Sequence, residues 1–404
     1  MKSFNFKTRI VCFLLASLWF ASCEKDDGPR DGSVTVEVRY PENYGEEYAG
    51  SVEVKALNSL NQEESIRTTS AAGIAEFEKL TPGNYTFSTG VSLNESEAEE
   101  LTGIGDAIQL SALEMNVQVA AGNEVVVTLL LAGSPVGGLV IKEIYYTGSK
   151  TASGGNYFSD QFIEIYNNST GIIYLDSLCI ADVYGVSGLI NSNNVPTEFQ
   201  DDQDAVYVNS VWRIPGSGED HPLAPGESII IAQDGVDHTA EELNPLSPVD
   251  LSGADWETFN ERADNRDADA PEVPNLERLY FTGGFDWLIT VFGPGIVLFK
   301  ANDFDKLERI PYPGYEDVLD PRIKIPADFV LDAFEALKDG NSGTFKRIPV
   351  ALDAGFVYAD DTYSSQSFRR KVAKTIQGRE VLEDTNNSSE DFNKLDSPTP
   401  GSFE

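Results

Sequence analysis

The chain alternates between apolar and polar residues over many short segments. Residues 34–38 carry valine at every second position, which predicts a strand with one buried face. Residues 73–87 predict two more strands around a Pro-Gly turn. Residues 115–119 and 125–131 predict a hairpin. About seven short strands within residues 33–131 are typical of a β-sandwich domain.

A glycine-rich segment, residues 132–138 (AGSPVGG), predicts a linker to a second domain. Beyond it, strand patterns recur at residues 139–146, 161–167, 172–182, 227–233 and 295–300. Acidic insertions with many Pro and Asn residues interrupt them near 185–222 and 235–285. We therefore expect the second domain to span residues 139–404.

One segment has helical spacing instead. Its apolar residues recur at intervals of three and four: Phe329, Val330, Ala333, Phe334 and Leu337. Pro326 and Gly340 stand where helices begin and end, so an amphipathic helix is predicted over residues 326–340. The expected fold class is mainly β, with two β-sandwich domains and this single amphipathic helix in the second.

The first 22 residues have the features of an export signal. Cations at positions 2, 7 and 9 precede an apolar run over residues 10–20. In a helix, that run extends about 16 Å, roughly half of a bilayer core. Ala21 and Ser22 precede Cys23, and the arrangement resembles the lipobox of bacterial lipoproteins, with Phe20 where leucine is usual. This implies cleavage before Cys23 and lipidation there; the alternative is an ordinary secretory signal.

The residues after Cys23 bear on where the protein is sent. Glu24, Lys25, Asp26 and Asp27 resemble the acidic export signal of Bacteroidota lipoproteins, which implies an outer-membrane anchor facing the cell exterior. The alternative is that residues 23–32 form only a solvated, flexible tether. Lipid on Cys23 would anchor the protein to the membrane without a spanning segment.

Only one cysteine remains for the folded part of the processed chain. Cys12 leaves with the leader and Cys23 carries lipid, so Cys179 has no partner for an intramolecular disulfide. Cys179 lies in an alternating segment and is expected to be a buried core thiol.

The charge of the chain limits its partners. The formal net charge is −37, and loss of the three leader cations takes it to about −40. Such a surface repels phosphate backbones, which argues against nucleic acid. It is compatible with cations, neutral sugars or a basic protein partner. With 41% hydrophobic residues, the chain still has enough apolar side chains for packed cores.

Two family resemblances follow from motifs. Residues 73–85, as Gly-x-Ala-x-Phe-x-x-Leu-x-Pro-Gly-x-Tyr, resemble the signature of transthyretin-like or carboxypeptidase-regulatory-like β-sandwiches. The second domain resembles the lamin-tail domain, an immunoglobulin-like sandwich, at residues 140–144, 162–167, 223–226, 367–370, 384–392 and 397–401. The whole arrangement resembles an uncharacterised family of Bacteroidota surface lipoproteins. That resemblance implies a β-barrel receptor of the TonB-dependent type in the outer membrane as a partner.

The sequence contains no HExxH, GxSxG, phosphate-loop or dinucleotide motif. His221 and His238 each lie among carboxylates, so a metal-dependent hydrolase that uses either histidine is one alternative function. The strand at 227–233 separates them by about 20 Å, which disfavours a joint site. The acidic residues Asp264, Asp267 and Asp269 suit Ca²⁺, with solvated loops as the alternative; no other cofactor is expected.

Aromatic residues near the insertions are candidates for recognition. In one interpretation they form a stacking platform for a sugar or an anchor against a barrel receptor, and in the other they pack the insertions onto the sandwich: Trp212, Trp256, Trp287 and Tyr280. Glu164 is expected to brace the sandwich, by accepting from loop amides or by pairing with Arg369 or Arg370.

The sequence thus favours a non-enzymatic, surface-exposed binding protein that assists a receptor or a nutrient-uptake system. A structural or adhesive role in the envelope is the remaining alternative.

Overall fold

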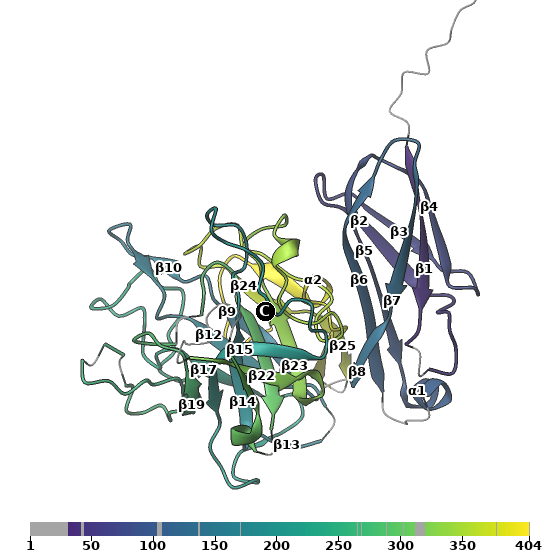
Figure 1. The fold of residues 1–404 in the computed structure, drawn as a ribbon. Coiled ribbons are helices and arrows are strands. Elements are labelled where there is room, and N and C mark those ends of the chain that lie inside the picture. The colour runs from purple at the N-terminus through teal and green to yellow at the C-terminus, as the bar shows by residue number, and fades with distance from the viewer. Residues whose placement is uncertain are drawn as a thin grey trace, which may run out of the picture.

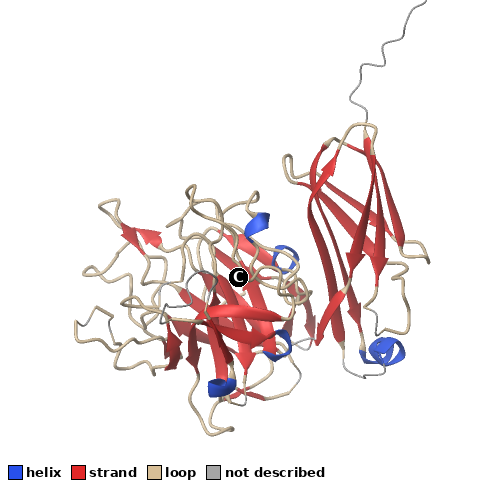
Figure 2. Cartoon of the chain, viewed as in Figure 1, coloured by secondary structure: helices blue, strands red, loops and turns tan. Residues whose placement is uncertain are grey.

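The computed structural model describes residues 31–41, 44–102, 107–135, 138–169, 171–264, 266–267, 269–287, 289–301, 303–311, 320–376 and 378–403. Cys23 and the signal at residues 24–27 lie outside these ranges. The fold is mainly β, as predicted, and its two domains lie side by side (Figures 1 and 2). None of the described helices is long and apolar enough to cross a membrane.

The first domain consists of two sheets packed face to face. One has the order β4-β1-β7 and the other β3-β2-β5-β6-β8. The strands are β1 (Gly32–Arg39), β2 (Glu53–Asn58), β3 (Glu64–Thr68), β4 (Ile74–Leu80), β5 (Gly83–Leu93), β6 (Ile108–Val119), β7 (Glu124–Leu130) and β8 (Ala132–Pro135). Helix α1 (Glu95–Thr102) connects β5 to β6. Alternating residues such as Val36, Phe77 and Phe87 fill the core between the sheets.

Two sequence predictions in this domain are wrong. β6 and β7 follow each other without pairing: β7 crosses to the other sheet and runs parallel to β1, with Val34 opposite Val125. In that position Val127 and Leu129 of β7 are buried in the core. The expected linker is also shorter, because Ala132–Pro135 pairs with β6 as an edge strand.

The second domain contains two larger sheets. Their orders are β18-β17-β12-β9-β24-β27 and β21-β22-β15-β14-β20-β23, with β19 also paired to β15. The first sheet comprises β9 (Leu139–Tyr145), β12 (Phe162–Asn167), β17 (Ser228–Ala232), β18 (Trp256–Glu257), β24 (Ser367–Arg370) and β27 (Phe392–Leu395). The second comprises β14 (Leu178–Val183), β15 (Ala205–Arg213), β19 (Glu277–Phe281), β20 (Gly295–Lys300), β21 (Glu308–Ile310), β22 (Arg322–Pro326) and β23 (Val330–Glu335).

Short elements complete this domain. The remaining strand pairs are β10 (Ser149–Lys150) with β11 (Asn156–Tyr157), β13 (Ile173–Tyr174) with β16 (Pro222–Leu223), and β25 (Val372–Ile376) with β26 (Arg379–Leu382). The helical turns are η1 (Phe304–Lys306), η2 (Ala327–Phe329), η3 (Gly343–Phe345) and α2 (Ser388–Asp391).

Both faces of the two large sheets are covered. Ile141, Ile163 and Ile180 belong to the core between the sheets. A further cluster, which includes Val297, covers the outer face of one sheet, and residues of the insertions such as Leu251 cover the other. Every residue of β9 and of β12 is therefore buried, including the polar residues Lys142, Glu143 and Glu164.

The helix predicted over residues 326–340 is wrong. Residues 327–329 form one 3₁₀ turn, and β23 then pairs antiparallel with β20, with Phe334 opposite Ile296. Long-range pairing outweighs the local helical spacing here. The expected insertion at 185–222 likewise contains a long core strand, β15, between a loop and β16.

Candidate functional site

The two histidines do not form a joint site. His238 is fully buried; its Nδ1 lies 2.8 Å from the Tyr157 hydroxyl and its Nε2 lies 3.0 Å from the Asp234 carbonyl oxygen. Burial lowers the pKa of His238 to about 4. The His221 ring instead meets the Trp256 ring edge-on, 5.0 Å away. Both ring nitrogens of His238 are engaged by protein atoms, and the two histidines lie in different surroundings, so metal binding at either one stays a prediction.

The acidic residues 264–269 separate into different environments. Asp264 is exposed and accepts from Arg262 at 2.9 Å, and Asp269 accepts from Asn275. Asp267 is buried, and its carboxylate lies beside those of Asp234 and Asp286. The structure therefore does not bring the three predicted residues together, although it places Asp267 in another acidic cluster.

The tryptophans belong to the core rather than to a recognition platform. Trp212, Trp256 and Trp287 are at most 7% exposed, and Trp287 Nε1 donates to Asp182 at 2.9 Å. The half-buried Tyr280 donates its hydroxyl to the Pro321 carbonyl. The platform interpretation is wrong for the three tryptophans, which pack as the alternative predicted.

Glu164 braces the sandwich from a fully buried position. Its carboxylate accepts from Lys142 Nζ at 2.8 Å and from the Gly401 amide at 3.2 Å. The loop-amide contact agrees with the sequence prediction. The predicted arginine partner does not, because Arg370 pairs with Asp332 instead.

A groove lies between the two domains, and its first wall is the outward face of the five-stranded sheet. Lys55 of β2 is opposite Ser88 of β5, and Ser88 is opposite Leu113 of β6, so the three form one row across the sheet. Leu57 and Thr86 form the next row. These residues alternate with core residues, which turns their side chains toward the second domain.

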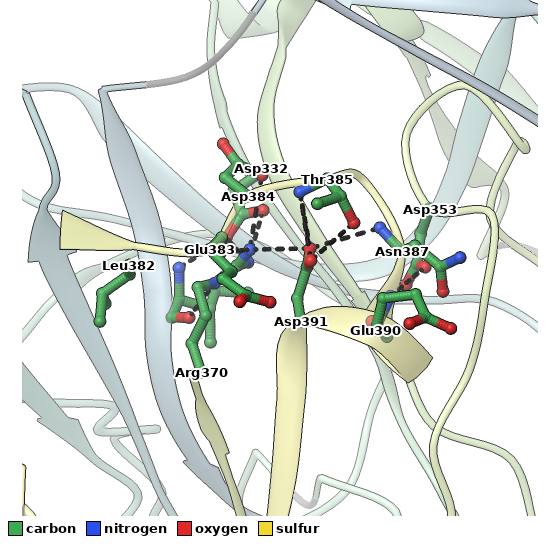
Figure 3. A network of polar contacts seen from close by, with 12 residues as sticks. Asp332, Asp353, Arg370, Leu382, Glu383, Asp384, Thr385, Asn387, Glu390 and Asp391 are labelled. Carbon is green, nitrogen blue, oxygen red and sulfur yellow. Dashed lines mark hydrogen bonds and ion pairs between the residues drawn. The ribbon is translucent and has the colours of Figure 1, made fainter. Parts of the chain in front are cut away.

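The second wall is the segment from Glu383 to Glu390, which a buried arginine fixes from behind (Figure 3). Arg370 NH2 lies 2.9 and 2.7 Å from the two carboxylate oxygens of Asp332. Its NH1 donates to Asp391 at 3.2 Å. Asp391 in turn accepts from the Thr385 amide at 3.0 Å and from its hydroxyl at 2.7 Å. Buried charges thus hold the wall in one conformation.

A second buried carboxylate supports the same segment. Asp353 accepts from the Ser388 amide at 2.8 Å and from the Ser388 hydroxyl. Asn387 caps α2 by accepting from the Ser389 amide at 3.1 Å. Gly355 lies so close to this cap that a β-carbon at position 355 would be 1.9 Å from Asn387 Oδ1. The wall therefore requires glycine at position 355.

One ion pair crosses the groove. Lys55 Nζ lies 2.5 Å from Glu390 Oε1 and 3.3 Å from Glu64 Oε2. Burial alone would lower the pKa of Lys55, but the hydrogen bond and charge of Glu390, with those of Glu64, outweigh it and raise that pKa. A further contact joins the Ser111 hydroxyl to the Thr385 carbonyl at 3.2 Å.

The ion pair divides the groove into two connected cavities of about 260 and 400 Å³. The smaller one combines apolar and aromatic side chains with uncharged polar ones: Leu57, Leu113, Met115, Phe356, Tyr358, Ser59, Gln62, Thr86, Ser88, Asn387 and Ser389. Its charged residues are Lys55, Glu64 and Glu390, which leaves one surplus negative charge. Such a lining suits a small ligand with apolar faces and several hydroxyl groups, and disfavours an anion.

Sequence reasoning did not find this groove. Phe356 and Tyr358 follow no strand pattern, and the outward residues of β2 and β5 look like ordinary solvent-facing positions. The segment at 384–392 did stand out, as part of the lamin-tail resemblance. What it faces depends on how the domains pack, which no local pattern encodes.

The chain is thus a two-domain, mainly β protein with a groove between its domains. A family described as "Protein of unknown function (DUF4876)" matches residues 224–399. The crystal structure of a DUF4876 family protein from Bacteroides thetaiotaomicron is similar, with 26% identity over 89% of this chain and 94% of that chain, and a TM-score of 0.58. No curated protein matches the chain.

Other solved structures share only fragments of the fold. A candidate carbohydrate binding protein from Pseudomonas aeruginosa has 12% identity over 24% of this chain and 88% of its own, with a TM-score of 0.18. A candidate polysaccharide binding protein from Bacteroides thetaiotaomicron has 10% identity over 44% and 76%, with a TM-score of 0.17. Likeness this low carries no argument about function.

Proposed function

We propose that this protein is a non-enzymatic, lipid-anchored binding protein of the outer membrane that takes a small neutral sugar into the groove between its domains. We further propose that it presents this ligand to a β-barrel receptor. The observation that carries the proposal is the lining of the smaller cavity, where Phe356 and Tyr358 lie among hydroxyl and amide groups.

The chemistry of a neutral sugar matches this lining. A sugar ring has apolar C–H faces that pack on aromatic rings and hydroxyl groups that exchange hydrogen bonds with Ser, Gln and Asn side chains. The surplus negative charge beside Lys55 repels anionic ligands. The buried Arg370 network supports a preformed wall, which lowers the entropic cost of binding.

The geometry counts against the hydrolase alternative. His238 has both ring nitrogens engaged, and His221 packs on Trp256. Of the described residues that form a cluster of candidate metal ligands, none is a histidine.

A panel of neutral and acidic oligosaccharides tests the proposal. We expect the processed chain to bind a neutral member, and Tyr358→Ala to weaken binding at least 10-fold. Tyr174→Ala is the matched control, because Tyr174 is exposed and lies outside the groove on β13. Binding only to acidic sugars, or equal binding by both variants, would contradict the groove assignment.

Anchoring and partnership need separate experiments. Labelled palmitate should enter the protein in cells and be lost in Cys23→Ala; retention of label in that variant would contradict the anchor. Gentle solubilisation of the outer membrane should co-purify a β-barrel receptor with the anchored protein. Recovery of the protein alone, with its lipid intact, would contradict the proposed partnership with a receptor.

A further inference from the structure

Three aspartates converge in the insertions of the second domain. Asp234 follows β17, Asp267 lies between β18 and β19, and Asp286 follows β19. One carboxylate oxygen from each of the three lies within 4.8 Å of the other two. The residues are only 7, 5 and 3% exposed. Three negative charges so close together and so far from water repel one another strongly.

One oxygen of each carboxylate is held by a neighbour and the other is free. Ser159 donates to Asp234, and the Asn260 amide donates to Asp267 Oδ2 at 2.9 Å. The Oδ1 atoms of Asp234, Asp267 and Asp286 are buried and have no hydrogen-bond partner. Buried polar atoms are nearly always paired, so an unpaired oxygen on each of the three clustered aspartates indicates a missing ligand.

Gln233 gives independent evidence that a ligand binds at this cluster. Its side-chain nitrogen donates to Asp286 Oδ2, which fixes the amide group at the cluster. Its Oε1 is buried and also has no partner, in a residue that is only 3% exposed. A carbonyl oxygen accepts no hydrogen bond from an ionised carboxylate, but it can join carboxylates around a cation.

No cation of the described chain compensates these charges through an ion pair. The nearby Arg262 pairs with Asp264, and Arg266 lies over the Phe285 ring at 4.3 Å. Burial, and then the charge of Asp286, raises the pKa of Asp267 to about 7.

We propose that Asp234, Asp267, Asp286 and the side-chain carbonyl of Gln233 bind one Ca²⁺. The four free donors are all oxygens, which hard cations prefer and which Zn²⁺ sites rarely use alone. Ca²⁺ binds oxygens at about 2.4 Å, so two of its ligands lie up to about 4.8 Å apart, and water molecules complete its coordination.

The surroundings preorganise this site. Glu257 accepts from the Gly235 amide at 2.7 Å and from the Ala270 amide at 2.8 Å, which ties together the loops that carry Asp234 and Asp267. His238 contacts the Asp234 carbonyl oxygen. Bound Ca²⁺ would therefore clamp three segments of the insertions onto β17 and β19.

Calcium titration of the processed chain, after chelator treatment, tests the site. We expect one Ca²⁺ per chain by calorimetry and a rise in Tm of about 5 °C or more at 100-fold excess over Kd. Tb³⁺ is a Ca²⁺ analogue that nearby tryptophan sensitises, and Trp287 adjoins Asp286. Terbium emission excited through tryptophan should appear and be displaced by Ca²⁺.

Asp267→Asn and the matched control Asp264→Asn distinguish Ca²⁺ binding at this site from nonspecific attraction of Ca²⁺ to the acidic surface. Asp267→Asn should lose Ca²⁺ binding at least 10-fold, and without Ca²⁺ its Tm should exceed that of the wild type because one buried charge is gone. Asp264→Asn should bind as the wild type does. No Ca²⁺-dependent change in the wild type, preference for Mg²⁺, or full binding by Asp267→Asn would overturn the proposal.

Discussion

Lys55 of β2 donates to Glu390 of α2 across the domain boundary, over 2.5 Å. Both side chains remain partly open to solvent, at 26% and 42% exposed. Exposed ion pairs contribute about 0–1 kcal/mol, because water screens the charges and two long side chains lose freedom. The pair is therefore a weak link between the domains rather than a source of stability.

Lys55→Met keeps the apolar stem and removes the charge. We expect the free energy of unfolding to fall by less than about 1 kcal/mol in urea denaturation. The difference from the wild type should shrink further at 1 M salt, where exposed charges are screened. A loss of several kcal/mol would show that the pair is coupled to the buried network behind it.

For Arg370 we expect a large loss of stability instead, because its charge is buried among carboxylates. Arg370→Met would leave Asp332 and Asp391 without their cation, and breaking a buried pair costs about 3–5 kcal/mol. We expect a fall of that size in the free energy of unfolding.

The neighbouring Arg369 is the matched control. It is half-buried and donates to the Thr399 hydroxyl at 2.9 Å. Arg369→Met should cost about 1 kcal/mol. Equal losses for the two variants would mean that the network of Figure 3 does not dominate the stability of the wall.

The sequence predicted the positions of the strands better than the pairing between them. A period of two located β1 and β4, which bury alternate residues against one core, and a continuous apolar run located β20, which is buried between two clusters. The same reasoning failed over 326–340, where the spacing of Phe329, Ala333 and Phe334 also fits a helix. Pairing with β20 decides between the two, and that contact is long-range.

The aspartate cluster was also hard to predict, because it too depends on contacts between distant segments. Asp267 was found by its acidic neighbourhood, but its partners Asp234 and Asp286 come from separate segments. Gln233 ends a predicted strand and Asp234 directly follows it, a position where functional side chains often gather, and this was the one available signal. Trp212 looked like a loop residue because β15 was assigned to an insertion.

Cys179 should be unreactive in the folded protein. Burial raises its pKa to about 12, so almost no thiolate exists at pH 8. In a chain that begins after Cys23, we expect a thiol reagent to label Cys179 only at the rate at which the domain opens. Adding denaturant should accelerate labelling in step with unfolding. Rapid labelling of the native protein would show that β14 is accessible without unfolding.

Gly355→Ala tests whether the groove wall is as tightly fitted as its geometry indicates. The new β-carbon would lie 1.9 Å from Asn387 Oδ1 and 2.7 Å from the Ser389 hydroxyl oxygen, so the cap of α2 must move. We expect a loss of about 1–3 kcal/mol in the free energy of unfolding, from overpacking and from the lost cap. Neutral-sugar binding should weaken as well, because Asn387 lines both cavities.

Gly171→Ala is the control for this substitution, because a β-carbon at position 171 meets nothing within 4 Å. Its effect on the free energy of unfolding should stay within about 0.5 kcal/mol. If Gly355→Ala lowered sugar affinity while leaving stability unchanged, the wall would be adaptable, and the groove would bind by adjusting to its ligand. If neither property changed, the segment from Glu383 to Glu390 would not form the wall of a binding site.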